Sequence, residues 1–472
     1  SVVKGNKISL EHYYSSCCPD EVFRQIYQGY REMCQSRRKL DFDDMILYCY
    51  ELFSQRKDIL AAWQKKFQYI LVDEFQDINQ LQYDIVRMLA QPQNNLFIVG
   101  DDDQSIYHFR GARPEIMLNF TRDYPEAETV TLNVNYRCSG QILSSAMRVI
   151  GENKKRFSKQ LSTPNQNGEA VQVREFQNPR EEYLAVVSEL RERIENGERL
   201  EDTAILLRTN QEAEGLVGAL MERQVPFNMK EKLPNLFQHW ICRNLLAYMH
   251  FAAGEKSRKY FLEFMNRPNR YISRDALSLS PVVSFEELKE FYKDKDWMCD
   301  RITTLETHLR VLRGLAPYAA INFIRKGMGY EEYLREYAEY RKIKPEELSE
   351  ILDRLTESTK GMNSLEEWEA YIEEYTEKLE EQARKAEQER EGVLISTLHG
   401  VKGLEYDHVY ILNVNEGSMP YRKAVLEPAI EEERRLFYVG MTRARKQLTL
   451  CYVRQQYEKK REPSRFLKEA GV

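Results

Sequence analysis

The chain has 472 residues, of which 42% are hydrophobic and 31% charged, and its formal net charge is -6 at pH 7. This composition excludes a disordered or collagen-like protein, and the length predicts about three domains at roughly 150 residues each. No apolar run approaches the ~20 residues that a membrane-spanning helix needs, so we expect no membrane partner. The first ten residues lack the apolar core of a signal peptide.

The cysteine pattern gives no sign of a metal site. Eight cysteines are scattered along the chain without a C-x-x-C pair, which argues against zinc binding and against a disulfide framework. We interpret them as reduced thiols and expect a cytoplasmic protein. The small net negative charge leaves room for a local basic groove that binds nucleic acid.

Hydrophobic periodicity predicts helices first and then alternating strands and helices. Residues 11–60 carry apolar side chains at steps of three and four, as amphipathic helices do. Two short apolar runs follow, 68–72 and 95–99, with a helical stretch between them. Further strand-like runs occupy residues 128–133, 170–175, 203–207, 393–396, 409–413 and 447–452. This alternation of strands and helices predicts an α/β fold with mostly parallel sheets.

Residues 236–390 differ from the rest because they contain helix-period segments and no convincing strand. They end in a charged run, Glu373 to Glu391, whose alternating signs predict a solvated helix with i,i+4 pairs rather than an interaction tail. The predicted domains are residues 1–130, residues 131–235 together with 391–472, and an all-helical insert of residues 236–390.

The first apolar run ends in carboxylates. It delivers Asp73 and Glu74 to the carboxyl edge of a sheet, where open α/β sheets bind ligands. Mg²⁺ prefers one or two carboxylates with water and phosphate oxygens, so Asp73 is a candidate metal ligand. Glu74 is a candidate general base for an attacking water. An acidic turn after a strand is also common without any such site, and that alternative stays open.

The second run ends in Gly100, three aspartates and Gln104, and is followed by Tyr107, Phe109 and Arg110. Interleaved aromatic and basic residues suit a single-stranded nucleic-acid track, because bases stack on aromatic faces for about 1–3 kcal/mol each and Arg neutralises phosphate. Core packing is the alternative for any one of these rings.

Two further segments present arginines. Tyr136 and Arg137 lie at a predicted strand-to-helix junction, where Tyr can stack on adenine and Arg can reach a γ-phosphate. A helix near the C-terminus presents Arg443 and Arg445, and surface salt bridges are the commoner role of such arginines. Between these segments, residues 393–411 predict a strand that runs into four polar or small residues: His399, Lys402, Gly403 and Glu405. Gly permits close backbone approach and Lys supplies charge for phosphate.

The chain contains five motifs in this order: D-E-x-Q-D, G-D-D-D-Q-S-I-Y-x-F-R-G-A, N-Y-R, T-x-H-x-x-K-G-L-E and E-E-E-R-R-L-x-Y-V-x-x-T-R-A. Together they closely resemble helicase motifs II to VI of the superfamily 1 UvrD/Rep family of DNA helicases. The resemblance covers residues 41–143 and 391–467, whereas residues 236–390 match only the position of the family's auxiliary insert. It implies an α/β fold with two RecA-like, P-loop NTPase-like domains, the first truncated, and an all-helical insertion in the second.

The resemblance also assigns roles. The matched nucleotide-site residues are Asp73 for Mg²⁺, Glu74 for the hydrolytic water, Gln104, Arg137 and Arg443 for the γ-phosphate, Tyr136 for adenine, Glu405 for the ribose, and Lys402 and Gly403 as further cofactor contacts. The matched single-strand track is Tyr107, Phe109, Arg110 and His399, and the family often has Trp where Phe109 stands. Residues 266–273 lie where the family often has a Gly-rich hairpin that grips duplex DNA. The glycines are absent here, which makes Arg267 and Arg270 weak candidates for the same contact.

One family motif does not occur in this sequence. Motif I, G-x-x-x-x-G-K-[ST], cradles phosphates with its backbone amides and its Lys, and no such segment is present. We therefore expect a chain that lacks the N-terminal part of the family with the Walker A motif and that is ATPase-deficient by itself. An incomplete first sheet would expose an edge, so we also expect self-association.

The expected function is the C-terminal major portion of an ATP-dependent 3′-to-5′ DNA helicase, which moves on single-stranded DNA and unwinds duplexes. Its cofactors would be ATP and Mg²⁺, and its partners single-stranded DNA and single-strand/duplex junctions. The alternative is a naturally motorless DNA-binding or interaction protein of the same family, although a retained set of γ-phosphate ligands favours the helicase. A helicase-nuclease is a third possibility, without a nuclease segment before Val472 to support it.

Overall fold

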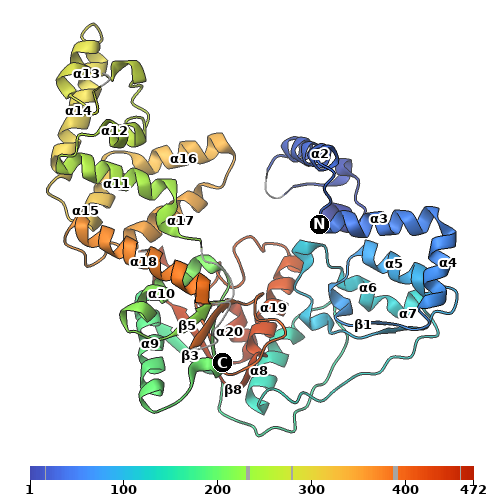
Figure 1. The fold of residues 1–472 in the computed structure, drawn as a ribbon. Coiled ribbons are helices and arrows are strands. Elements are labelled where there is room, and N and C mark those ends of the chain that lie inside the picture. The colour runs from blue at the N-terminus through green and yellow to red at the C-terminus, as the bar shows by residue number, and fades with distance from the viewer. Residues whose placement is uncertain (16–17, 230–233, 278–279, 386–391, 458) are drawn as a thin grey trace. The chain divides into compact units, whose positions relative to one another are not determined.

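A computed structural model describes residues 1–15, 18–229, 234–277, 280–385, 392–457 and 459–472 (Figure 1). Contacts divide the chain into two units, Ser1–Glu231 with Arg390–Val472, and Lys232–Glu389. The predicted domain boundary at residues 390 and 391 lies outside the described residues, as does Cys17. Within the described ranges, no helix combines the length and the apolar character that a bilayer crossing requires.

The first unit begins with helices, which confirms the expectation for residues 11–60. The elements before residue 130 are α1 (Val2–Gly5), α2 (Asp20–Ser36), α3 (Phe42–Gln55), α4 (Lys57–Lys66), β1 (Ile70–Val72), α5 (Gln80–Ala90), β2 (Leu96–Ile98), α6 (Pro114–Leu118) and α7 (Phe120–Asp123). A capping box starts α3, since the side chains of Asp41 and Asp44 each accept a hydrogen bond from the other's backbone N–H. Lys4 neutralises both carboxylates from 2.6 Å.

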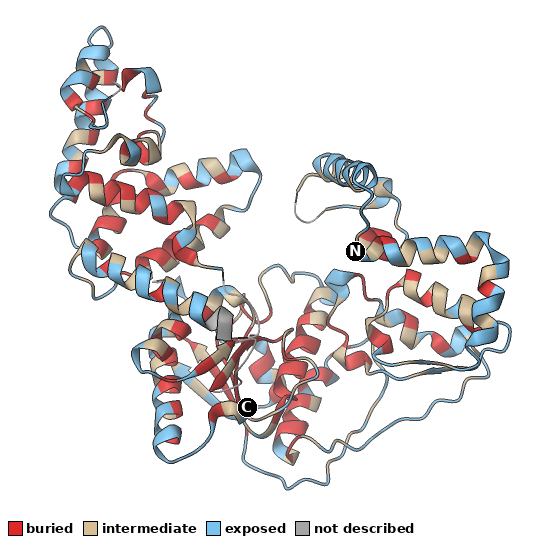
Figure 2. Ribbon diagram, in the orientation of Figure 1, coloured by how far each residue is buried: buried red, intermediate tan, exposed pale blue. Residues whose placement is uncertain are grey.

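The first sheet consists of β1 and β2, which pair in parallel with Val72 opposite Ile98. Val72 and Ile98 pack on a small core built around Phe75. Alternate strand residues point to opposite faces, and Leu71 and Phe97 on the other face are 72% and 61% exposed. The described strands therefore leave one apolar face of this sheet uncovered (Figure 2).

The second sheet has six parallel strands in the order β3-β8-β7-β4-β6-β5. Its strands are β3 (Gln172–Phe176), β4 (Thr203–Leu207), β5 (Phe227–Met229), β6 (Val393–Thr397), β7 (Tyr406–Ile411) and β8 (Ala444–Val453). Its helices are α8 (Gly140–Gly151), α9 (Pro179–Glu195), α10 (Ala213–Glu222), α19 (Glu427–Met441) and α20 (Arg465–Ala470), and a short hairpin pairs β9 (Gln455–Gln456) with β10 (Lys459–Lys460). Every residue of β4 is buried, as in a parallel strand covered on both faces. The predicted α/β fold with a parallel sheet is confirmed.

One predicted strand is wrong. Residues 128–133 form no strand, and Val130 and Leu132 are 82% and 81% exposed. A single bridge from Val134 to Ser162 is the pairing described nearby. Alternating apolar residues favour a strand, but a strand also needs a neighbour to accept its hydrogen bonds. The structure also contains β5 and the β9–β10 hairpin, which are too short for their pattern to predict them.

The second unit is helical, and its described residues form no strand, as expected. Its helices are α11 (Trp240–Ala253), α12 (Arg258–Phe264), α13 (Phe285–Phe291), α14 (Asp296–Leu312), α15 (Pro317–Asn322), α16 (Tyr330–Arg341), α17 (Pro345–Glu357) and α18 (Leu365–Lys385). The predicted charged helix is α18, with an i,i+4 pair between Glu374 and Lys378 and with Trp368 and Tyr375 buried. The rest of the charged run, from residue 386, lies outside the described residues.

Candidate functional site

A buried lysine joins the loops that follow β1, β2 and β6. Lys402 pairs with Asp77 and donates to the backbone oxygen of Gln104 at 3.0 Å, and its Nζ lies 3.5 Å from Oε2 of Glu74. Its side chain is only 8% exposed. Burial raises the pKa of Asp77, against the opposing effect of Lys402. The next residue, Gly403, has a φ of +81°, which a glycine adopts without strain. The predicted cofactor contact Lys402 thus already has protein partners in this structure.

Arg443, between α19 and β8, is the most deeply buried of the predicted phosphate ligands. Its guanidinium donates to the carbonyls of Val439 at 2.8 Å and Leu404 at 3.1 Å, and to Oε1 of Gln104 at 3.5 Å. Among the described residues, no carboxylate forms an ion pair with it. Burial, and secondly the charge of Arg137, lower its pKa to about 10. Since an unpaired buried charge is costly, this environment favours a bound anion.

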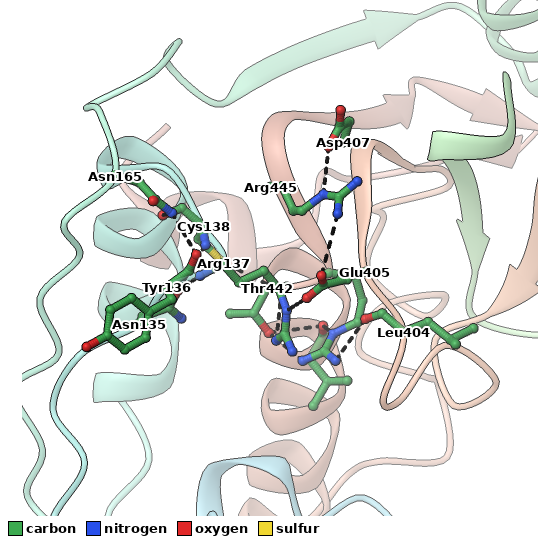
Figure 3. A network of polar contacts seen from close by, with 12 residues as sticks. Asn135, Tyr136, Arg137, Cys138, Asn165, Leu404, Glu405, Asp407, Thr442 and Arg445 are labelled. Carbon is green, nitrogen blue, oxygen red and sulfur yellow. Dashed lines mark hydrogen bonds and ion pairs between the residues drawn. The ribbon is translucent and has the colours of Figure 1, made fainter. Parts of the chain in front are cut away.

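Arg137 and Glu405 contact each other (Figure 3). Arg137 Nε donates to Glu405 Oε2 at 2.7 Å, and this bond is the main cause that lowers the pKa of Glu405. Arg445 Nε donates to Asp407 at 2.6 Å, and its Nη1 lies 3.5 Å from Glu405. Arg445 is therefore a salt-bridge residue, as the alternative role predicted, whereas Arg443 is not.

Tyr136 presents an open ring beside this network. Its side chain is 76% exposed, and Figure 3 shows the ring pointing away from Glu405. The side chain of Asn135 accepts hydrogen bonds from the backbone N–H groups of Arg137 and Cys138, both at 2.9 Å. This turn fixes Tyr136 and Arg137 on opposite sides of the junction, where one can stack on a ring and the other can reach an anion.

The carboxylates after β1 are accessible. Asp73 Oδ1 accepts from the backbone N–H of Glu74 at 2.8 Å, and Gln76 donates to Glu74 Oε2 at 2.6 Å. Glu74 has a φ of +50°, a conformation that costs a non-glycine residue roughly 1–2 kcal/mol and that clusters at functional sites. The Glu74 side chain is 60% exposed. Two exposed carboxylates at the end of a strand have the oxygen ligands that Mg²⁺ prefers.

The acidic triplet Asp101, Asp102 and Asp103 is neutralised by protein cations. Its carboxylate oxygens lie within 4.8 Å of one another. Lys159 pairs with all three, and Arg156 donates two hydrogen bonds to Asp103, at 2.8 and 2.7 Å. The sequence pattern did not predict either Lys159 or Arg156 as a partner of the triplet. The available signal was the triplet itself, because adjacent buried carboxylates require positive partners.

The four predicted track residues lie together although His399 is far from the others in sequence. The Phe109 ring meets His399 edge to face with centroids 5.4 Å apart, and Tyr107 at 6.0 Å. The Arg110 guanidinium lies 4.9 Å from the Tyr107 centroid and 5.5 Å from that of Phe109. Burial, followed by the charges of Arg208 and Arg110, lowers the pKa of His399 to about 4. Lys402 Nζ also lies 5.1 Å from the Tyr107 centroid. The cluster is therefore an aromatic surface beside two cations, and Phe109 is 57% exposed.

The two weak candidates in the insert differ. Arg270 is buried, and it donates to the carbonyls of Phe264 and Met265 at 3.1 and 3.2 Å. These bonds occupy its guanidinium and make it a structural residue. Arg267 is part-exposed, with Glu263 at 3.4 Å and the Trp240 ring at 5.8 Å.

Two family models match the chain. The UvrD/REP helicase N-terminal domain matches residues 3–125, and the UvrD-like helicase C-terminal domain matches residues 130–455. The first match does not support the expectation that the N-terminal part of the family is missing, because that domain is represented here. These matches leave the roles of the single residues as predictions.

Relatives agree with the family models. YjcD of Bacillus subtilis is 35% identical over 95% of this chain and 59% of its own length, and DNA helicase II of Haemophilus influenzae is 33% identical over 94% and 64%. The ATP-dependent DNA helicase Rep of Escherichia coli is 32% identical over 95% of this chain and 70% of its own. The chain thus spans about six tenths of the length of the first two relatives. By the models that it matches and by these identities, the chain belongs to the UvrD/Rep helicase family.

Proposed function

We propose that this chain forms most of the motor of an ATP-dependent DNA helicase, with RecA-like domains at residues 1–130 and at 131–235 with 391–472, and an auxiliary insert at 236–390. The observation that carries the proposal is the hydrogen bond from Arg443 to Gln104, which joins the two sheets' loops beside the Tyr107–Phe109–His399 aromatic cluster. Residues suited to a γ-phosphate therefore lie next to residues suited to single-stranded DNA. Such an arrangement couples the state of a nucleotide to the position of a strand.

The polar residues fit the terminal phosphate of a nucleotide and its divalent cation. Asp73 would hold Mg²⁺, which on binding supplies charge neutralisation at the phosphate, and Glu74 would orient the attacking water. Arg443 has a buried positive charge without a carboxylate, as an anion site requires. Tyr136 would stack on adenine, and Glu405 would approach the ribose.

Arg137 can exchange partners when an anion arrives. Its pair with Glu405 is 30% and 46% exposed on the two sides, so it is worth at most about 1 kcal/mol. A phosphate with several negative charges attracts the guanidinium more strongly than one carboxylate does. We propose that Arg137 leaves Glu405 for the γ-phosphate and releases Glu405 toward the ribose.

The aromatic cluster would carry single-stranded DNA, with movement in the 3′-to-5′ direction and preferred action at single-strand/duplex junctions. The test is the affinity of the purified chain for a fluorescent oligothymidylate. We expect Phe109→Ala to weaken binding about tenfold, a loss of about 1.4 kcal/mol and within the range for one stacked base. Phe97→Ala, which removes an equally exposed ring on β2, is the matched control. Equal affinity of both variants and the parent would refute the track.

We further propose that this chain by itself binds ATP weakly and hydrolyses it poorly. The support is the absence from its sequence of a G-x-x-x-x-G-K-[ST] loop for the inner phosphates. Phosphate release by the purified chain, with and without Mg²⁺, tests this. Mg²⁺-dependent turnover that is abolished by Glu74→Gln would overturn the proposal of weak ATP hydrolysis. The same result would support the catalytic role of Glu74.

A motorless DNA-binding protein remains the second candidate, favoured by the same missing loop. It predicts the Phe109→Ala effect without any response of DNA affinity to ATP, whereas a motor predicts such a response once a Walker A segment is supplied.

The uncovered face with Leu71 and Phe97 supports the related proposal of self-association. Sedimentation that shows a concentration-independent monomer would exclude it, and Leu71→Lys should dissolve any dimer that forms.

A further inference from the structure

An aromatic-cationic cluster lies on the surface of the helical insert. Trp297 and Arg301 are four residues apart on α14 and so share one face of the helix. The Arg301 guanidinium carbon lies 5.0 Å from the Trp297 ring centroid and 5.1 Å from that of Tyr271, which comes from the loop after α12. Trp297 and Tyr271 are 52% and 62% exposed. Two accessible rings thus hold one guanidinium.

Arg301 keeps its hydrogen-bond donors. In the described part of the chain, no carboxylate pairs with Arg301 and no acceptor receives a hydrogen bond from it, so its contacts there are the two rings. A guanidinium has five N–H donors in a fixed plane, and ring contacts through its face leave them available to a phosphate. The polar ends of Tyr271 and Trp297 likewise have no described partner.

The loop directs Tyr271 outward. The side chain of Asn266 bonds the backbone of Ile272 in both directions, at 3.0 and 2.8 Å, and Arg270 and Ile272 are buried on either side of Tyr271. Tyr271 itself has a φ of +59°, a conformation in which glycine would be unstrained. A large ring therefore occupies a backbone position that disfavours it. Strain of this kind clusters at binding and active sites, which makes the Tyr271 ring a candidate contact for a ligand.

We propose that Tyr271, Trp297 and Arg301 form a binding site for unpaired nucleotides on the insert. One or both rings stack on a base, and Arg301 contacts the adjoining phosphate. Stacking on a ring face requires a base that is not already stacked in a duplex, which favours single-stranded over double-stranded nucleic acid. The inference rests on the proposed action of this chain on DNA and adds a contact point separate from the Tyr107–Phe109 track. Tyr271 belongs to residues 266–273, for which the resemblance implied a duplex contact, so the inference replaces that contact with one to unpaired nucleotides.

Photo-crosslinking locates the site without assuming that the insert folds alone. The full chain is irradiated with a short oligothymidylate, and crosslinked peptides are identified by mass spectrometry. We expect crosslinks at the peptides that contain Tyr271 and Trp297. Crosslinks at Tyr107 and Phe109 without any in the insert would overturn this inference and leave the proposed function standing. Crosslinks in the insert alone would do the reverse.

Affinity measurements test the roles of the three residues. In a Phe109→Ala background, Trp297→Ala should weaken oligothymidylate binding about tenfold, while Tyr340→Ala, which removes an 82% exposed ring at the end of α16, should not. Arg301→Gln should reduce the salt dependence of binding by about 0.7 in log K per log salt, one phosphate contact. Tyr271→Gly should weaken binding without lowering the melting temperature, whereas a structural ring would lower it. Variants that lose only duplex affinity, or none, would refute the site.

Discussion

Glu182 is a buried carboxyl group that should make stability depend on pH. It lies on α9 with no exposed surface, and its Oε1 accepts a hydrogen bond from the backbone N–H of Asn413 at 3.1 Å, while its Oε2 has no described partner. Burial raises its pKa from 4.5 to about 8. We predict that Glu182→Gln removes this pH dependence from the second sheet.

The sign follows from which state loses its proton first. Below pH 4.5 the carboxyl is neutral in both states and costs nothing. As the pH rises from 4.5 towards 8, the unfolded chain ionises and the folded one does not, so the stability falls, and it levels off above 8. The full shift corresponds to roughly 5 kcal/mol, at about 1.4 kcal/mol per pKa unit, and most of this loss falls between pH 5 and pH 8.

The assay follows Cys451, which is buried in β8 of the same sheet. A disulfide reagent that reacts at both pH values labels Cys451 when the sheet unfolds. Labelling in a urea series gives the free energy of unfolding, which is extrapolated to water. The parent should lose most of these roughly 5 kcal/mol between pH 5 and pH 8 relative to Glu182→Gln. Glu192→Gln, an exposed position on the same helix, should behave as the parent. Parallel pH profiles of parent and Glu182→Gln would refute the reasoning, whatever their absolute stabilities.

Three more outcomes follow from the structure. Arg325→Met should destabilise the insert by about 3–5 kcal/mol, because it leaves buried Asp353 without the partner that now lies at 2.5 Å. Urea unfolding followed by tryptophan fluorescence measures this loss. As a control, Arg335→Met, which breaks an exposed pair, should cost under about 1 kcal/mol. His399 is neutral near pH 7 because burial lowers its pKa to about 4. The affinity for oligothymidylate should therefore change equally between pH 6 and pH 8 in the parent and in His399→Gln. A different pH dependence in the two proteins would show that His399 titrates in this range. Phe109→Trp should strengthen oligothymidylate binding, because Trp offers a larger stacking face, and weaker binding in a folded variant would show that Phe109 is not a stacking surface.

Local motifs placed three of the four residues of the proposed track together, because these three are close in sequence. Tyr107, Phe109 and Arg110 share one turn, and His399 follows β6 in the neighbouring sheet. Since β2 and β6 belong to different sheets, the local pattern could not place His399 beside the other three residues, and their grouping was expected from the family resemblance alone. The strand β4 could also be predicted from the sequence, and its five residues are all buried.

Partners that come from other segments could not be read from the sequence. Lys159 and Arg156 lie some fifty residues after the acidic triplet that they neutralise, in a stretch without regular structure. Nothing in their local sequence distinguishes them from solvated cations. The difference between Arg443 and Arg445 could not be predicted either, because a single residue separates a buried guanidinium from one paired at the surface.

The same distant pairs bear on how the proposed motor would work. Lys402 holds Asp77 and Gln104, Lys159 holds the acidic triplet, and Arg443 bonds Gln104. Each bond links a loop after β1 or β2 to the part of the chain that builds the second sheet. A nucleotide phosphate that draws Arg443 or Lys402 must therefore alter bonds to Gln104, whose loop continues directly into Tyr107 and Phe109. The route from phosphate to DNA track is then a few residues of one loop, and changes at Gln104 should affect DNA binding and nucleotide response together.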